Sequence, residues 1–120
     1  MPQESRRFPR ANAERHIRLA FTYGGQRFEG VAMQTLSEAG CGFVAPESML
    51  ALMDVLEGST PVEGLVLDCD QLPHQSLRAR VAYTVGHAPV MVGIEFTNPP
   101  PAFRERLSQL VQALLQAHAS

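Results

Sequence analysis

The sequence has no long apolar run and only two cysteines. No stretch of its 120 residues approaches the ~20 consecutive apolar residues that a membrane-spanning helix needs. The first ten residues, MPQESRRFPR, lack the apolar centre of a secretory signal. The two cysteines, Cys41 and Cys69, lie far apart and without metal-ligand spacing. We therefore expect a cytoplasmic protein with reduced thiols and no inserted membrane segment.

The overall charge excludes a general affinity for polyanions. The formal net charge is −2, so we expect no DNA or RNA partner. The length indicates one domain, and a 45% hydrophobic composition suffices for one core. Positive charge is densest in RRFPR, residues 6–10, where three arginines surround a proline. Any anion site must therefore be local, and this segment is the first candidate.

Groups that could carry catalysis are sparse. The histidines do not occur at ligand spacing; they are His16, His74, His87 and His118. No Gly-x-Ser-x-Gly nucleophile motif is present. Asp68 and Asp70 flank Cys69, which predicts two carboxylates on one face of a strand, without a third group to complete a site. We therefore expect neither an enzyme nor a metal or cofactor site.

Period-two alternation of apolar residues predicts most of the chain to be β-structure. The alternation of Ile17, Leu19 and Phe21 is typical of a half-buried strand. Gly24-Gly25 separates this run from the next and predicts a hairpin. The six strand-like runs are residues 15–23, 27–36, 41–45, 62–69, 76–85 and 90–97. They predict a small six-stranded antiparallel β-barrel.

Two segments have helical periodicity instead. Met49, Leu52, Met53 and Leu56 predict a short helix over residues 48–57, with Ser48 as its cap and Gly58 at its end. The tail carries a longer apolar stripe, formed by Phe103, Leu107, Leu110, Val111, Leu114 and Leu115. This C-terminal helix either covers the barrel or pairs with a second copy, so monomer and homodimer both stay open. Residues 1–12 have no periodicity and are predicted to be a flexible basic arm before one domain, residues 13–120.

Two short motifs occur in order around the hairpin. Arg6 and Arg10 form Arg-x-x-x-Arg, and TLSEAG, residues 35–40, follows the predicted hairpin. Near the end, VGIEF precedes the tail helix. This arrangement resembles the PilZ domain, a small β-barrel receptor for the bacterial second messenger cyclic di-GMP. The family's second motif is Asp/Asn-x-Ser-x-x-Gly; Ser37 and Gly40 match it, and Thr35 replaces the Asp or Asn.

The resemblance implies a ligand site made of the arm and the loop. Its residues would be Arg6, Arg7, Arg10, Thr35, Ser37 and Gly40. Arginine suits cyclic di-GMP because a guanidinium pairs with phosphate, pairs with guanine O6 and N7, and stacks on a purine. A hydroxyl at Ser37 and a sharp turn at Gly40 would help to hold the ligand. From the residues alone, Ser37-x-x-Gly40 is equally an ordinary turn, and the arginines a solvated tail.

Two functions follow from the resemblance. The first is a cyclic di-GMP receptor that relays its signal through contact with an unidentified downstream protein, in motility, biofilm or exopolysaccharide formation, or virulence. The second is a PilZ-like adaptor that binds no nucleotide, for example in type IV pilus assembly. Thr35 favours the adaptor and the arginine pair favours the receptor.

Overall fold

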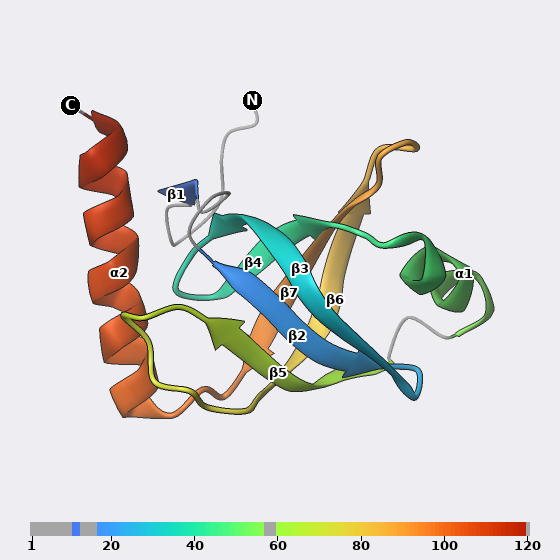
Figure 1. The fold of residues 1–120 in the computed structure, drawn as a ribbon, viewed down its shortest axis with the longest axis horizontal. Coiled ribbons are helices and arrows are strands. Elements are labelled where there is room, and N and C mark those ends of the chain that lie inside the picture. Colours follow the sequence, from blue (N-terminus) through green and yellow to red (C-terminus); the bar gives the residue numbers. More distant parts are fainter. Residues whose placement is uncertain (1–10, 13–16, 57–59, 120) are drawn as a thin grey trace.

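A computed structural model describes residues 11–12, 17–56 and 60–119. The elements are β1 (Ala11–Asn12), β2 (Arg18–Tyr23), β3 (Gln26–Leu36), β4 (Gly40–Val44), α1 (Glu47–Val55), β5 (Pro61–Asp68), β6 (Leu77–Val85), β7 (Met91–Thr97) and α2 (Pro101–Ala119). Antiparallel pairing runs in the order β3-β2-β5-β6-β7-β4, and β4 pairs again with β3. The sheet therefore closes into the predicted six-stranded barrel, and β1 is an additional short strand beside β3 (Figure 1).

Alternating side chains of the strands fill the barrel. Leu19 and Phe21 of β2 and the preceding Ile17 are buried, as the sequence pattern predicts. The Phe21 ring lies 5.2 Å from the Phe28 ring and 5.4 Å from the Phe43 ring, measured between centroids. Aromatic groups at such distances contribute large buried areas, so this cluster ties β2, β3 and β4 together.

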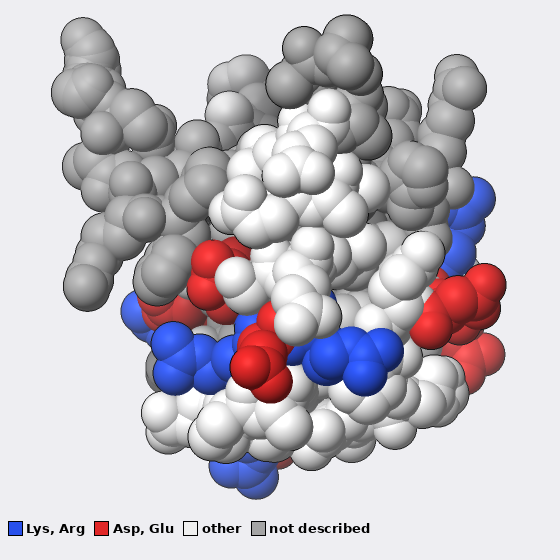
Figure 2. All heavy atoms as spheres, turned by 90° about the vertical axis from the view of Figure 1, so that its left-hand side faces the viewer, with Lys and Arg blue, Asp and Glu red and all other residues white. Residues whose placement is uncertain are grey.

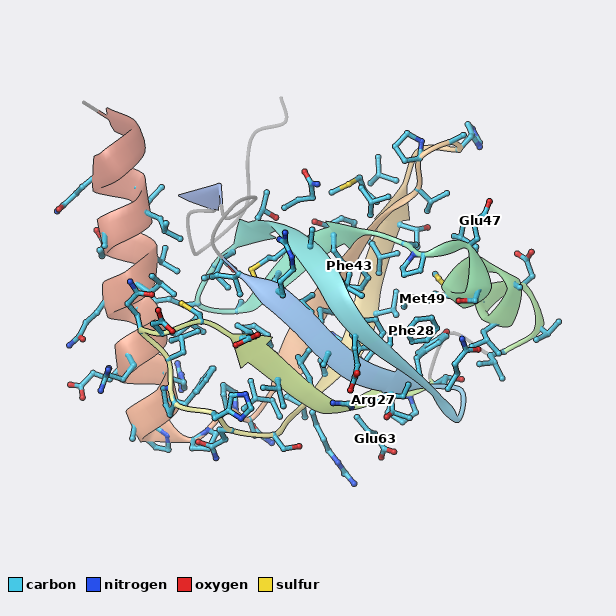
Figure 3. All side chains as sticks on the ribbon, viewed as in Figure 1. Arg27, Phe28, Phe43, Glu47, Met49 and Glu63 are labelled. Atoms are coloured by element: carbon cyan, nitrogen blue, oxygen red, sulfur yellow. The ribbon has the colours of Figure 1, made fainter. Side chains whose placement is uncertain are left out.

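Helix α1 covers the end of the barrel where β2 turns into β3. Gly24 and Gly25 have φ of +60° and +81°, which suits a two-residue hairpin turn and confirms the predicted hairpin. A Cβ at Gly24 would lie 2.6 Å from Leu56 Cδ1, so the turn and the end of the helix are in close contact. Met49 is buried, and it lies with Phe28 at this end (Figure 3).

The predicted cap of α1 is wrong. The helix begins after Pro46, and no side chain caps its first turn. The proline ring fixes φ at about −65°, and Pro46 occupies the N-cap position with φ of −61°, so the helix starts at Glu47 and Ser48 lies inside its first turn. Gly58, the predicted end, lies outside the described residues, and the last helical residue is Val55.

Helix α2 lies against the opposite end of the barrel from α1 (Figure 1). Its predicted stripe joins the barrel core: Phe103, Leu107, Leu110, Val111 and Leu114 are buried. The stripe therefore covers the barrel, the first of the two alternatives open from the sequence. In the part of the chain that the structure describes, neither helix has the length and apolarity required to cross a membrane.

The predicted carboxylate pair does not share a strand. Asp68 is the last residue of β5, whereas Asp70 lies in the turn that follows. The Leu72 N–H donates to the Cys69 oxygen at 3.2 Å, so the chain bends between the two aspartates. Among the described residues, no group of three or more His, Cys, Asp or Glu side chains could hold a metal ion.

Candidate functional site

The second motif lies where β3 turns into β4, beside β1. Thr35 is near the end of β3, Ser37 follows the strand, and Gly40 begins β4. In β1, Ala11 pairs with Leu36 and Asn12 pairs with Thr35. The three arginines predicted to bind the ligand, Arg6, Arg7 and Arg10, lie outside the described residues. Arg10, the last residue of the first motif, directly precedes Ala11. Ala11 pairs with Leu36, which lies within the second motif.

Ser37 holds the turn together. Its Oγ accepts the backbone N–H groups of Ala39 and Gly40, each at 3.2 Å, and lies 3.3 Å from the Gly40 oxygen to which it donates. The Ser37 N–H donates to the same oxygen at 2.9 Å. The side chain is only 6% exposed. Its hydroxyl therefore orders the loop from within, a positioning role that the motif alone did not reveal.

Gly40 is needed for a different reason from the one expected. A glycine was expected because the chain turns there, but Gly40 is not among the residues with positive φ. A Cβ at this position would overlap the backbone carbonyl oxygen of Ile94 on β7. The Phe96 N–H also donates to the Ala39 oxygen at 2.8 Å. Glycine therefore allows the loop to lie directly against β7.

Thr35 has a buried hydroxyl without a partner. Leu36 and Cys41 pair across β3 and β4 and face the core, so the neighbouring pair, Thr35 and Gly42, faces the outer wall. Within the described part of the chain, Thr35 Oγ1 is the buried side-chain polar atom that lacks a hydrogen-bond partner. Buried polar atoms are nearly always paired, so the Thr35 hydroxyl is an unusual, unsatisfied group on the strand that pairs with β1.

The outer wall next to Thr35 is formed by backbone. Gly42 pairs with Gly93 of β7, and Gly93 pairs with Tyr83 of β6. A Cβ at Gly93 would overlap the ring of Tyr83, so the ring lies over this glycine. We call Gly40, Gly42 and Gly93 the glycine patch. The sequence analysis did not predict the patch or Tyr83, because their proximity depends on the register of the strands. The one signal in the sequence was Gly93, the glycine of VGIEF.

An ion pair borders the glycine patch. Glu95 pairs in register with Gly40 on one side and with Arg80 on the other. The carboxylate of Glu95 and the guanidinium of Arg80 are in direct contact. Both side chains are substantially exposed, so the pair contributes little to stability. It places one carboxylate and one guanidinium, whose charges neutralise each other, beside the turn between β3 and β4.

The comparisons with known proteins agree with this architecture. The family model of the PilZ domain matches residues 4–113. Among curated protein sequences, none matches the chain. The fold is similar to MrkH of K. pneumonia solved with c-di-GMP, with a TM-score of 0.77 and 14% identity, over 97% of this chain and 55% of MrkH.

Two further structures share the fold. The PilZ domain of YcgR from Escherichia coli, solved with c-di-GMP, gives a TM-score of 0.67 at 14% identity, over 96% of this chain and 95% of that domain. The Bacillus subtilis inhibitor of motility MotI gives 0.70 at 11% identity, over 98% of this chain and 53% of MotI. The chain thus spans about half the length of MrkH and MotI. These likenesses establish the fold, and the match of the family model over most of the sequence establishes that the chain belongs to the PilZ domain family.

Proposed function

We propose that the chain is a cyclic di-GMP receptor. The ligand is held between the arginine arm and the outer wall: Arg6, Arg7, Arg10 and Thr35 contact it, and Ser37 and Gly40 shape the turn beside it. The observation that carries the proposal is the pairing of β1 with β3, in which Ala11 lies opposite Leu36 and Asn12 opposite Thr35. This pairing ties the chain next to Arg10 to the strand that leads into the turn, so two motifs separated by a hairpin serve one site.

The chemistry of the wall suits a nucleotide with two purine bases. The three glycines of the patch are buried, and the ring of Tyr83 covers Gly93. A base that lies on this wall therefore meets the Tyr83 ring, which offers a surface for stacking that is favourable for any base. The Thr35 hydroxyl gains a partner from the ligand, and arginines of the arm take the phosphates and guanine edges.

Titration calorimetry with cyclic di-GMP tests the proposal. We expect binding by the unaltered protein and about a ten- to hundred-fold loss for Arg10→Ala, because a charge-assisted hydrogen bond contributes about 1.5–3 kcal/mol. Arg78→Ala is the matched control, because it also removes one arginine, from an exposed position on β6. Arg78 Nη2 lies 3.6 Å from Glu63 Oε2 on β5. An absence of heat with the unaltered protein overturns the receptor function. Equal losses of affinity in Arg10→Ala and Arg78→Ala show a general effect of positive charge and contradict a specific role of the arm.

The receptor acts by contact with a downstream protein in the cytoplasm. Its output is motility, biofilm or exopolysaccharide formation, or virulence. The similarity to MotI, described as an inhibitor of motility, supports the first of these.

A second function is favoured by one residue. The PilZ-like adaptor without nucleotide is supported by Thr35, which stands where the family has Asp or Asn and offers only a hydroxyl. The same titration separates the two functions, because the adaptor gives no heat with cyclic di-GMP.

A further inference from the structure

A charged cleft lies beside the Ser37–Gly40 turn, on the side toward α2. Its volume is about 220 Å³, and Glu38, Glu95 and Arg104 line it. A shallower cleft of about 380 Å³ continues along α2 and shares Glu38 and Arg104 with the first. Both charged side chains thus border the same space from opposite elements, the turn and the helix.

The backbone brings these two elements together. The Phe96 N–H bonds to the Ala39 oxygen and fixes the turn against the end of β7. The chain then reverses at Asn98, whose φ is +46°, and passes through two prolines into α2. The Arg104 N–H donates to the Pro100 oxygen at 2.9 Å, which places Arg104 in the first turn of the helix. The cleft is therefore a product of the loop and the helix start.

The charges that face this cleft are not all neutralised. Glu95 is paired with Arg80. In the described residues, no carboxylate lies within 4.0 Å of the Arg104 guanidinium, and no basic group lies that close to the Glu38 carboxylate. Figure 2, which views the molecule from the α2 side, shows acidic and basic side chains next to each other across this face. The cleft of about 220 Å³ thus offers one unpaired carboxylate and one unpaired guanidinium, and the Glu105 carboxylate lines only the shallower cleft along α2.

An unpaired carboxylate and an unpaired guanidinium match the polar edges of guanine. Guanine presents N1–H and N2–H donors, which a carboxylate accepts, and O6 and N7 acceptors, which a guanidinium fork satisfies. Thr35 provides no carboxylate at the position where the family has Asp or Asn. The side-chain carbonyl or carboxylate oxygen that the family offers there must therefore be supplied by another residue or be absent.

We propose that Glu38 and Arg104 read one guanine base of the ligand. Glu38 accepts from N1–H and N2–H, and Arg104 donates to O6 and N7. Glu38 thereby makes the site selective for guanine over bases without the N2 amino group. This inference deepens the proposed function and rests on it.

The test compares cyclic di-GMP with cyclic di-IMP, whose hypoxanthine bases lack the N2 amino group, by titration calorimetry. The unaltered protein should bind cyclic di-GMP about ten- to hundred-fold more tightly, as expected for one charged hydrogen bond. Glu38→Gln replaces the carboxylate with a weaker, neutral acceptor, so it should weaken cyclic di-GMP more than cyclic di-IMP and reduce the preference. Arg104→Gln should weaken both ligands equally, because both have O6 and N7. Glu47→Gln is the matched control, since Glu47 is exposed on α1 at the other end of the barrel (Figure 3).

The outcomes separate the inference from the receptor function. If the unaltered protein binds cyclic di-GMP and Glu38→Gln keeps the same preference as Glu47→Gln, the inference is overturned while the receptor stands. If the unaltered protein binds neither ligand, the receptor function fails and the inference fails with it. Thermal unfolding of each variant checks its folding. Neither Glu38 nor Glu47 has an ion-pair partner among the described residues, so both variants should stay folded, with a small loss for Glu47→Gln because Glu47 lies in the first turn of α1.

Discussion

Replacement of Ser37 by alanine should loosen the turn that joins β3 to β4. The mutation removes the acceptor of two backbone N–H groups, those of Ala39 and Gly40, and the donor to the Gly40 oxygen. The Gly40 N–H is buried, so water does not fully replace the lost partner. Each such bond contributes a net 0.5–1.5 kcal/mol, and the long distances place these bonds in the lower part of that range. We expect the free energy of unfolding to fall by about 1–3 kcal/mol.

Urea unfolding followed by circular dichroism measures this change. The midpoint should decrease while the slope stays constant, because the fold and its buried area are retained. In a thermal melt, the same loss corresponds to a decrease in Tm of about 4–12 °C for a domain of this size. Ser48→Ala is the matched control: Ser48 is exposed in the first turn of α1, where no side chain makes a capping bond.

The ligand gives a second readout for the same variant. If Ser37 acts by ordering the loop, Ser37→Ala should weaken cyclic di-GMP in the titration, whereas Ser48→Ala should not. A Ser37→Ala protein as stable as Ser48→Ala, within about 0.5 kcal/mol, would refute the assignment of the turn's stability to this hydroxyl.

Three other predictions concern single side chains. Thr35→Val should raise the free energy of unfolding by about 1 kcal/mol, because an unpaired buried hydroxyl is removed, and should weaken cyclic di-GMP; an unchanged affinity in calorimetry would show that Thr35 does not contact the ligand. Gly40→Ala should destabilise the fold by more than about 2 kcal/mol, since its Cβ would overlap the Ile94 carbonyl oxygen, and urea unfolding at native-like stability would contradict that packing. Burial raises the pKa of Tyr23 above 10.0, because the folded state disfavours the charged phenolate. The contribution of the protonated phenol to the free energy of unfolding is therefore complete below about pH 10 and is lost as the pH rises through the folded-state pKa. Tyr23→Phe should lack that part of the alkaline loss in urea titrations, and an identical pH profile would exclude Tyr23 as its source.

The fold was predictable because its determinants are local. Alternation at Leu19 and Phe21 specifies which face of β2 is inside, and the double glycine specifies where the hairpin closes. The stripe that begins at Phe103 likewise specifies the buried face of α2. Helix capping was predicted less well because Ser48 and Pro46 are both acceptable near a helix start, and only the backbone geometry decides between them.

The turn that carries the second motif was predictable in position, but the contacts that hold it were not. Ser37 and Gly40 could be found from their spacing, yet the need for glycine arises from Ile94, a residue distant in sequence that approaches through the pairing of β4 with β7. The same holds for Tyr83, which lies over Gly93 only because of the register between β6 and β7. A motif read along the chain cannot reveal these contacts, since each depends on two strands that meet after folding.

This distinction bears on how Thr35, at the Asp or Asn position of the second motif, should be interpreted. In the sequence, a hydroxyl replaces the stronger carboxylate or amide acceptor, which favours the adaptor. In three dimensions, a carboxylate needs only to face the same base, and the turn carries one at Glu38 while α2 brings Arg104 to the opposite side of the cleft. Because Glu38 and Arg104 are far apart in the sequence, the motif does not show that they line one cleft, and Thr35 taken alone favours the adaptor. The selectivity between cyclic di-GMP and cyclic di-IMP decides whether the packing of α2 restores what the motif lacks.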